Sequence, residues 1–467
     1  MENDFIDYTG IKVTVTDLPS DEEIMQNYEG DIWIDPDKKV LNEHVFARAF
    51  KDINHLQYSN GLFYTREGKK SEEIVNQDIA LSLEGMGIAK DVGKTTRKLS
   101  EAVKLHSTVE SLNMDENVIP FHNGDFIVDR WEFHLGEFSP VPYRIPTSLK
   151  FEIKPTPYFD KWIKDLFYPE DKEVIMEFLG YCLVFSTKAQ KALFLVGDAG
   201  AGKGGIGKIL EAMLGGAMLS IPSTQEFLQD KFKLPELENK LVMYDDDLDS
   251  AALEGTGLYK KLITNDIKLT ADRKYGQPFE FTPRIKLIAS CNEMLTSSND
   301  LTEGFYRRLL PVLIKPKRAD FVPDLDFYSH LQKEREGIAQ SAIAGLQRLI
   351  ANKWVLPETD RTKNYLAQKR SIENPMPDFM QDVFEYSPLY PGVPTTEIMR
   401  LYEYWCRKNS SPVWKPRQVQ TWLADNAEKY KIVASRTVKN GDKYVRGYAG
   451  MQVKGGWKMS GKIPLVR

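Results

Sequence analysis

Cysteine and clustered histidine are scarce in this sequence. Its 467 residues include three cysteines and six histidines. The cysteines, Cys182, Cys291 and Cys406, lie far apart without the paired spacing of zinc ligands, and no histidine joins them in a cluster. A disulfide scaffold is therefore excluded, no metal cage is predicted, and we expect core thiols in a reducing cytoplasm.

Long apolar runs are also absent. No stretch approaches the roughly 18 consecutive apolar residues of a membrane-spanning helix. The first residues, Met-Glu-Asn-Asp, lack the basic and apolar segments of a signal peptide. Internal repeats and low-complexity tracts are missing as well. We therefore expect a cytoplasmic protein without a membrane partner, long enough for two or three domains.

The net charge is small but unevenly distributed. The whole chain carries −5, whereas residues 401–467 hold 14 Lys and Arg against 4 Asp and Glu, a net of +10. The rest of the chain therefore carries −15. A basic terminal segment on an acidic body predicts binding to a polyanion such as nucleic acid; the alternative is an ordinary solvated basic surface.

The most specific motif follows an apolar run of strand type, residues 192–196. Glycines let backbone N–H groups turn toward a triphosphate, Lys203 reaches its outer phosphates, and the helix that starts near Gly205 directs its positive end toward them. The motif therefore predicts ATP binding, with an ordinary glycine-rich connection as the alternative. Its residues, with the G-x-x-x-x-G-K spacing of a phosphate-binding loop, are Gly197, Asp198, Ala199, Gly200, Ala201, Gly202, Lys203, Gly204 and Gly205.

One position departs from this pattern. The residue after the lysine is usually Ser or Thr, whose hydroxyl ligates Mg²⁺, and here it is Gly204. A shifted frame that ends on Lys208 also fits the spacing, but it lies too far from the strand. We therefore keep Lys203 as the phosphate-binding lysine, with Mg²⁺ bound in a site that lacks the usual hydroxyl.

Three carboxylates end a second strand-like run, residues 240–244. They are Asp245, Asp246 and Asp247. A buried strand that ends in acids is the expected partner of a phosphate loop, because one acid holds Mg²⁺ and the next polarises the attacking water. We assign Asp245 to the metal and Asp246 to the water and the metal region, with Asp247 in reserve. Acids that merely end a strand and cap a helix are the alternative.

Two further elements complete the predicted site. The strand-like run at residues 285–289 leads to Asn292, which is expected to orient the attacking water or touch the γ-phosphate. Arg307 and Arg308 precede another strand-like run, residues 309–314. Such an arginine can stabilise the transition state at the γ-phosphate of a neighbouring subunit. A loop-opening Asn and a pair of surface arginines are the alternatives.

A hairpin is predicted between these elements, over residues 268–282. Its tip carries Arg273, Lys274 and Tyr275. A basic and aromatic tip of this kind contacts a phosphodiester backbone and stacks on bases. An exposed hairpin without function is the alternative.

The remaining elements are read from periodicity and turn residues. Short strands are expected at residues 31–35 and 61–65, followed by a mostly helical segment at 71–105. Hairpins are expected at Asn123-Gly124 and Asn440-Gly441. A proline-rich linker spans residues 140–157, a long helical segment spans 324–351, and a polar linker passes through Pro375 and Pro377. The alternation of helices and apolar strands in the middle predicts an α/β fold with a parallel sheet.

This ordered set resembles the superfamily 3 helicases of the AAA+ class, in particular the primase-helicase type of poxviruses, satellite phages and mobile genetic islands. The length and layout are most similar to the replication initiator-helicases of staphylococcal pathogenicity islands and cassette elements. No catalytic primase domain is expected in this chain. The resembling segments are Gly197–Lys203, Tyr244–Asp246, Lys260–Tyr275, Asn292 and Arg307–Arg308, with weaker matches at Ile119–Gly124, Glu336–Leu346 and Leu401–Cys406.

The resemblance implies an AAA+ P-loop ATPase core with an N-terminal α+β domain and a C-terminal winged-helix domain. The expected boundaries are 1–145 for an assembly or partner-binding domain, 146–360 for the motor and 370–467 for the winged helix. A recognition helix at 416–430 and a wing at 433–453 would then bind DNA, though a winged helix can also serve protein packing. The residues expected to contact DNA are Arg417, Arg436, Lys443 and Arg446.

The expected activity is ATP-dependent DNA unwinding. The chain would act as a hexameric ring during replication of a mobile element, with ATP and Mg²⁺ as cofactors. Its partners would be single- and double-stranded DNA and other replication proteins. One alternative is an origin-binding initiator with little processive unwinding. The other is a nucleotide-dependent switch or loader that hydrolyses ATP poorly because of Gly204.

Overall fold

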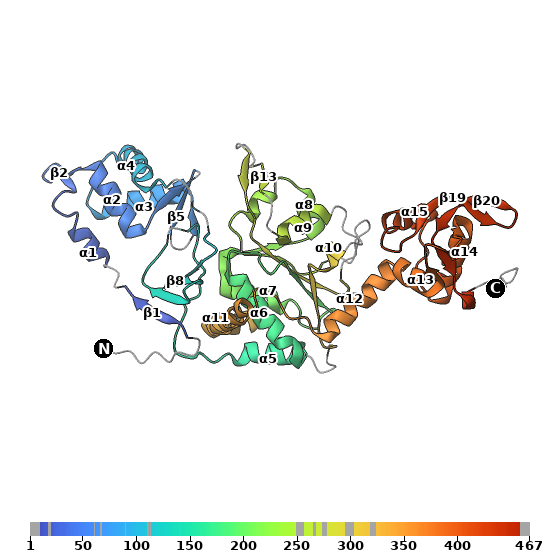
Figure 1. Cartoon of the computed structure of the whole chain (residues 1–467). Coiled ribbons are helices and arrows are strands. Elements are labelled where there is room, and N and C mark those ends of the chain that lie inside the picture. Colours follow the sequence, from blue (N-terminus) through green and yellow to red (C-terminus); the bar gives the residue numbers. More distant parts are fainter. Residues whose placement is uncertain are drawn as a thin grey trace. The chain divides into compact units, whose positions relative to one another are not determined.

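The chain folds into two compact units, residues 1–359 and 360–467. The computed structural model (Figure 1) describes residues 10–16, 20–59, 61–65, 68–88, 90–109, 112, 114–139, 141–248, 256–264, 268–272, 278–294, 303–317 and 324–457. Each unit combines helices with sheets, so the fold is of the mixed α/β kind. Among the helices of the described residues, none combines the length and apolarity that crossing a membrane requires.

A small helical body opens the first unit and has its own core, with Phe46, Phe63 and Leu99 buried together. The strands predicted at 31–35 and 61–65 correspond to β2 and β5. The helical segment predicted at 71–105 is two helices, because Gly87, with φ +74°, follows the end of α3. The elements are α1 (Asp21–Gln26), β2 (Trp33–Asp35), β3 (Val40–Leu41), α2 (Glu43–Asn54), β4 (Gln57–Ser59), β5 (Leu62–Thr65), β6 (Gly68–Lys70), α3 (Glu72–Gly85) and α4 (Val92–Ser107).

A four-stranded sheet follows, in the order β1-β9-β8-β7. Its strands are β1 (Lys12–Val15), β7 (Val118–Phe121), β8 (Gly124–Ile127) and β9 (Glu132–Leu135). The hairpin predicted at Asn123-Gly124 is present, with Phe121 paired to Gly124. Phe121, Phe126 and Phe133 are buried in the same core as the helices and strands after residue 157. The boundary predicted at 145–146 therefore falls inside a shared core, in a segment (141–156) without helix or strand.

A five-stranded parallel sheet forms the centre of the first unit, in the order β11-β12-β15-β10-β16. This confirms the predicted parallel sheet, and β10 covers the predicted residues 192–196. Its elements are α5 (Pro157–Leu166), α6 (Lys172–Leu183), β10 (Ala192–Val196), α7 (Gly205–Leu214), β11 (Met218–Ile221), α8 (Thr224–Gln229), β12 (Val242–Asp245), α9 (Thr256–Thr264), β13 (Leu269–Ala271), β14 (Phe279–Phe281), β15 (Lys286–Cys291), α10 (Glu303–Tyr306), β16 (Leu309–Leu313) and α11 (Phe327–Ala351), with short 3-10 helices η1 (Pro169–Asp171), η2 (Gly215–Ala217) and η3 (Leu234–Leu237).

Helices cover both faces of this sheet. Leu193 and Leu195 of β10 share a core with α6, α7 and α11, and α11 packs against both α6 and α7. Successive strand residues point to opposite faces, so Phe194 and Met243 lie on the other side, near Thr224 of α8 and Tyr259 of α9. The central part is thus a three-layer arrangement of helix, sheet and helix.

The second unit has a separate core, in which Phe379, Tyr402 and Trp405 are buried. Residues 360–373, predicted to be part of a linker, form helix α12. Pro375 and Pro377 then open α13, where proline is accommodated because the first helical N–H groups need no intrahelical partner. The elements are α12 (Asp360–Glu373), α13 (Met376–Val383), β17 (Phe384–Tyr386), β18 (Val393–Pro394), α14 (Thr395–Lys408), α15 (Pro416–Asp425), β19 (Val433–Asn440), β20 (Lys443–Ala449), β21 (Met451–Val453) and η4 (Gly455–Trp457).

Candidate functional site

Three parts of the predicted site, namely the glycine-rich loop, the acids after β12 and Asn292, meet at the carboxyl edge of the parallel sheet. β12, β15 and β10 are neighbours in the sheet, and Val196 at the end of β10 pairs with Cys291 at the end of β15. The N–H of Gly197 donates to the carbonyl of Cys291 at 3.1 Å. Because parallel strands end at the same edge, the glycine-rich loop, the acids after β12 and Asn292 lie together. Ligands in open parallel sheets bind at this edge.

The loop between β10 and α7 turns on glycine. Gly200 and Gly202 have φ of +71° and +104°, in the region that side chains with a Cβ rarely adopt. The ammonium of Lys203 donates to the carbonyls of Gly197 and Asp198 and, at 3.1 Å, to Oδ1 of Asn292. Lys203 and Asn292 are 89 positions apart in the sequence, and both were predicted as site residues; in the structure they are in direct contact.

Lys203 is well buried for a charged side chain. It is 8% exposed, and this burial lowers its pKa below the ordinary lysine range. The neighbouring acids Asp198, Asp246 and Asp247 act in the opposite direction. Helix α7 starts directly after the lysine, with Gly204 as its N-cap and no side-chain capping bond. Its first turn therefore presents the positive end of the helix dipole beside the ammonium.

The three acids after β12 differ sharply in surroundings. Asp245 is 2% exposed, and its Oδ2 accepts from the N–H and the hydroxyl of Thr224 at 2.7 and 2.6 Å. Its Oδ1 accepts from the N–H of Asp247 at 3.3 Å. Asp246 and Asp247 are exposed, and Asp246 accepts a hydrogen bond from the Tyr244 hydroxyl. Both oxygens of Asp245 therefore already accept hydrogen bonds from the protein. The predicted role of Asp245 as a metal ligand would require its carboxylate to face the glycine-rich loop instead.

Arg307 and Arg308 lie at the other end of the sheet. The carbonyl of Arg308 accepts from the N–H of Ala192, at the start of β10, whereas the glycine-rich loop follows the end of that strand. Five strand residues separate the two by about 13 Å. Arg307 is exposed, and the half-buried Arg308 donates to the carbonyl of Gly304. The fold therefore does not bring these arginines to the loop of their own chain.

Sequence reasoning missed Trp162 of α5. Its indole N–H donates to the carbonyl of Gly202 at 3.1 Å, which ties the loop to a helix 40 positions earlier in the sequence. A Cβ on Gly205 would lie 2.9 Å from Cε2 of this indole. The only sequence signal was the presence of Gly205 and Gly207 inside a helix, where glycine costs about 1 kcal/mol against alanine and indicates a close neighbour.

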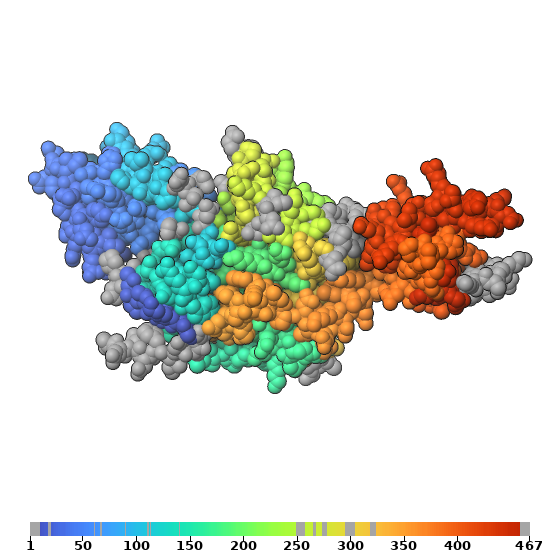
Figure 2. Space-filling view, viewed as in Figure 1, coloured from blue at the N-terminus to red at the C-terminus, as the bar shows by residue number. Residues whose placement is uncertain are grey.

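The predicted DNA-binding residues fall into two groups. Arg273, Lys274 and Tyr275 lie outside the described residues, although β13 and β14 form the predicted antiparallel pair that leads to them. In the second unit, Arg417 lies on α15, Arg436 on β19, and Lys443 and Arg446 on β20, and all four side chains are exposed. β19 and β20 pair up to Asn440 and Lys443, which confirms the predicted hairpin. Its surface forms part of the red region of Figure 2.

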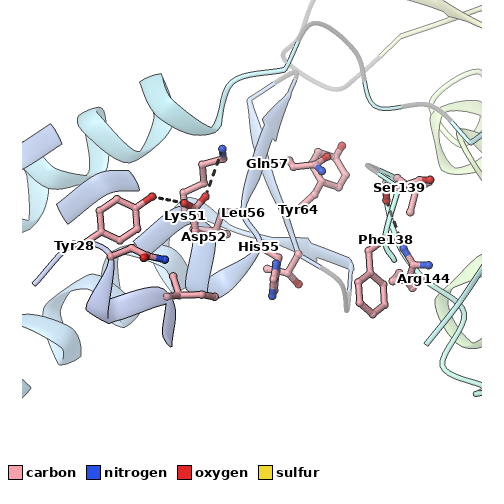
Figure 3. A pocket seen from close by; sticks show the side chains of 14 residues that line it. Tyr28, Lys51, Asp52, His55, Leu56, Gln57, Tyr64, Phe138, Ser139 and Arg144 are labelled. Atoms are coloured by element: carbon pink, nitrogen blue, oxygen red, sulfur yellow. Dashed lines mark hydrogen bonds and ion pairs between the residues drawn. The ribbon is translucent and has the colours of Figure 1, made fainter. Parts of the chain in front are cut away.

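A cavity of about 450 Å³ lies away from this edge, in the first unit (Figure 3). Tyr28, Lys51 and Asp52 line one side, and Phe138 and Arg144 line another. The Tyr28 hydroxyl donates to Asp52 at 2.5 Å, and Arg144 is paired with the buried Asp125. These charged groups already satisfy one another, and none of the predicted site residues lines the cavity. The sheet edge is therefore the stronger candidate.

Comparisons with known proteins give a short match and distant likenesses. Residues 195–308 match a family of unknown function (DUF5906), which is less than half of the chain. No curated protein matches the sequence. The solved "A form apo structure of NrS-1 C terminal region-CTR" is similar at TM-score 0.48 and 13% identity, covering 85% of this chain and 95% of that one. The "apo structure of NrS-1 C terminal region (305-718)" is similar at TM-score 0.46 and 14% identity, with the same coverage.

Proposed function

We propose that this chain is an ATP-driven DNA helicase and replication initiator of a mobile genetic element, built on an AAA+ core of the superfamily 3 type. The observation that carries the proposal is the convergence at one sheet edge of the glycine-rich loop, Lys203, Asn292 and two exposed carboxylates. A phosphate loop, a polar group at the end of an adjacent strand and acids after another strand are the parts that phosphoryl transfer requires.

The nucleotide phosphates would bind between the loop and the start of α7. Lys203 now donates to carbonyls of the loop and to Asn292. A triphosphate would offer this ammonium stronger, charged acceptors at the positive end of the helix. Asn292 would then be released to orient the attacking water or contact the γ-phosphate.

Asp246 and Asp247 fit the oxygen chemistry that Mg²⁺ prefers, because both carboxylates are exposed beside the loop. Asp245 fits less well, since both of its oxygens accept hydrogen bonds from the protein. When bound, Mg²⁺ would neutralise phosphate charge. The residue that polarises water is then Asp246 or Asp247, while Asp245 fixes the start of α8 through Thr224.

The arginines support a shared site between copies of the chain. Arg307 and Arg308 lie at the opposite end of the sheet from their own loop, as described above. A ring of six copies would bring the arginines of one copy to the phosphates of the next, where a guanidinium stabilises transition-state charge. ATP turnover would then depend on assembly.

The C-terminal unit would supply the DNA-binding surface. A helix-turn region with α14 and α15 followed by the β19–β20 hairpin is what a winged helix requires, with α15 in the major groove and the hairpin along the backbone. The same exposed basic side chains favour a second candidate function, an origin-binding initiator that remodels duplex DNA with little unwinding. If the full chain binds a specific duplex sequence more tightly than a scrambled duplex, this second candidate is favoured.

The test is ATP hydrolysis by the unmodified chain and by Arg308→Ala and Arg307→Ala, alone and mixed, with and without single-stranded DNA. We expect DNA to stimulate turnover, and we expect either Arg308→Ala or Arg307→Ala to lose about 1000-fold in rate. Mixtures of that variant with the unmodified chain should be less active than the unmodified fraction alone would be. Arg130→Ala, an exposed arginine between β8 and β9, is the matched control. ATP binding without turnover in the unmodified chain would favour a nucleotide-dependent switch and contradict the motor.

A further inference from the structure

We propose that Tyr244 is a positioning residue that holds Asp246 over Gly204, and that Asp246 thereby occupies the space that a Ser or Thr side chain would fill in this loop. Gly204 is then a requirement of the site and not a loss of function. This inference rests on the proposed nucleotide site. The Asp246 carboxylate would then bind the metal of a metal–nucleotide complex in place of the missing loop hydroxyl.

The first support is the position of Tyr244 on β12 and of Asp246 directly after its end. Residues i and i+2 of a strand point to the same face, and the residue between them points to the other. Tyr244 packs in the core that includes α7, whereas Asp245 bonds to Thr224 of α8 on the opposite face. Asp246 therefore follows Tyr244 toward α7 and the loop.

The second support is the hydrogen bonding of the Tyr244 hydroxyl. It donates to Oδ1 of Asp246 and lies 3.2 Å from the hydroxyl of Ser290 on the adjacent strand β15. Tyr244 is 4% exposed, and its ring is part of the core that includes α7. An exposed carboxylate is thus held by a rigid, buried aromatic side chain.

The third support is a pair of glycines, at the N-cap and in the first turn of α7, that leave room for these groups. A Cβ on Gly207 would lie 2.9 Å from Cζ of Tyr244, so the ring rests directly on the helix backbone. A Cβ on Gly204 would lie 3.0 Å from Oδ1 and 3.5 Å from Oδ2 of Asp246. The carboxylate therefore sits over the N-cap of α7, where the helix dipole favours negative charge. A Cβ at 204 would push this carboxylate from its position by a few tenths of an ångström.

A purely structural role for the Tyr244–Asp246 bond predicts a different result from a positioning role. If the bond only stabilises the end of β12, its loss lowers the free energy of unfolding and leaves the dependence on Mg²⁺ unchanged. If it positions Asp246, its loss weakens the effect of Mg²⁺ and leaves metal-free nucleotide binding unchanged.

The experiment measures the affinity of the full chain for a fluorescent ADP analogue, during a Mg²⁺ titration and separately in EDTA. For Tyr244→Phe we expect the Mg²⁺ concentration at half effect to rise about tenfold or more, the loss of one hydrogen bond to a charged group, with affinity in EDTA within about twofold. Tyr143→Phe is the matched control, because the Tyr143 hydroxyl is also part of the core and donates to a carbonyl, that of Asn239. It should lose comparable thermal stability and keep the Mg²⁺ dependence of the unmodified chain.

Gly204→Ser provides the second arm. It restores the usual hydroxyl, yet we expect it to raise the Mg²⁺ requirement about tenfold or more, because its Cβ displaces Asp246. A lowered Mg²⁺ requirement in Gly204→Ser, or an unchanged one in Tyr244→Phe, would overturn the inference while the nucleotide site stands. If the unmodified chain binds the analogue neither with Mg²⁺ nor in EDTA, the proposed function is overturned and this inference with it.

Discussion

The carboxyl edge of the five-stranded sheet and the β19–β20 hairpin present charge in opposite ways. At the sheet edge, Lys203 is buried and bonded to carbonyls and to Asn292, and Asp246 is held by Tyr244. On the hairpin, Arg436, Lys443 and Arg446 are exposed, and among the described residues no ion pair involving them is found. The first arrangement would select a ligand by fixed geometry, and the second would attract a polyanion by its positive field.

This contrast has a physical cause. The hairpin extends beyond its core, since Val438 is its only buried residue between 434 and 446. Side chains on both faces are therefore solvated, and under the proposed function they would bind phosphates without a preformed site. The sheet edge is instead lined by α5, α7 and the adjacent strands, so the buried charged groups there, Lys203 and Asp245, need partners. Substitutions should consequently act through geometry at the edge and through salt-dependent affinity on the hairpin.

The largest expected effect is that of Lys203→Ala on the sheet edge. Removing the ammonium that donates to the loop carbonyls should lower ATP hydrolysis by more than about 100-fold, since the outer phosphates lose their charge partner. Steady-state ATPase assays of the full chain measure this. Lys208→Ala is the control, because Lys208 is exposed on α7 and belongs to the shifted frame. Loss of turnover in Lys208→Ala with Lys203→Ala active would identify the shifted frame as the binding loop.

The next effect concerns the hairpin side of the comparison. The triple variant Arg436→Ala, Lys443→Ala and Arg446→Ala should weaken DNA binding by about 100-fold at low salt and reduce the slope of log affinity against log salt by about 2–3, one for each lost phosphate contact. Its ATP turnover without DNA should stay unchanged. The matched control removes three exposed charges from α4, Lys94, Arg97 and Lys98. Equal losses in both triples would contradict a DNA-binding hairpin.

A smaller effect is expected at Lys286, a buried lysine at the amino end of β15. Lys286 is 1% exposed and donates to the carbonyl of Val184, and burial lowers its pKa to about 7. The unfolded chain keeps this lysine protonated up to about pH 10.5, so between pH 7 and 10.5 the unfolded state binds more protons and stability rises with pH. Lys286→Met removes this proton linkage.

We expect Lys286→Met to raise the free energy of unfolding by roughly 2 kcal/mol at pH 7, after allowing for the lost bond to Val184. The gain should shrink toward zero near pH 10 and level off below pH 7. Chemical denaturation at pH 7, 8.5 and 10 measures it, with the exposed Lys172→Met as control. A gain independent of pH would contradict this account, because it would show that Lys286 has the same protonation state in the folded and the unfolded chain.

The smallest effect sharpens the account of the loop. Trp162→Phe keeps a ring beside Gly205 but removes the indole N–H that donates to Gly202. Nucleotide affinity should fall about three- to fivefold, the usual contribution of one neutral hydrogen bond, with little change in turnover at saturation. A fluorescence-detected binding titration measures the change. An unchanged affinity would mean that the loop keeps its conformation without this bond.

Much of the fold followed from the sequence because it depends on local pattern. The apolar runs before Gly197, Asp245 and Asn292 are strands, and their parallel pairing was expected from alternation with helices. The linker predicted around Pro375 is largely helical, since residues 360–373 lack proline and contain good helix formers. Trp162 could not be predicted as a loop contact, because no spacing rule connects α5 to a turn 40 residues later.

The sequence by itself determined that a glycine-rich loop, three adjacent acids, an asparagine and two arginines each stand beside a strand end. Only the tertiary structure decided which of them meet. Adjacent residues at a strand end point to opposite faces, so the packing of α7 on one face and α8 on the other separates Asp246 from Asp245. The same packing places the carboxylate of Asp246 over Gly204, the position at which the motif usually has a Ser or Thr. Such contacts between distant segments are set by how the layers stack and not by spacing along the chain.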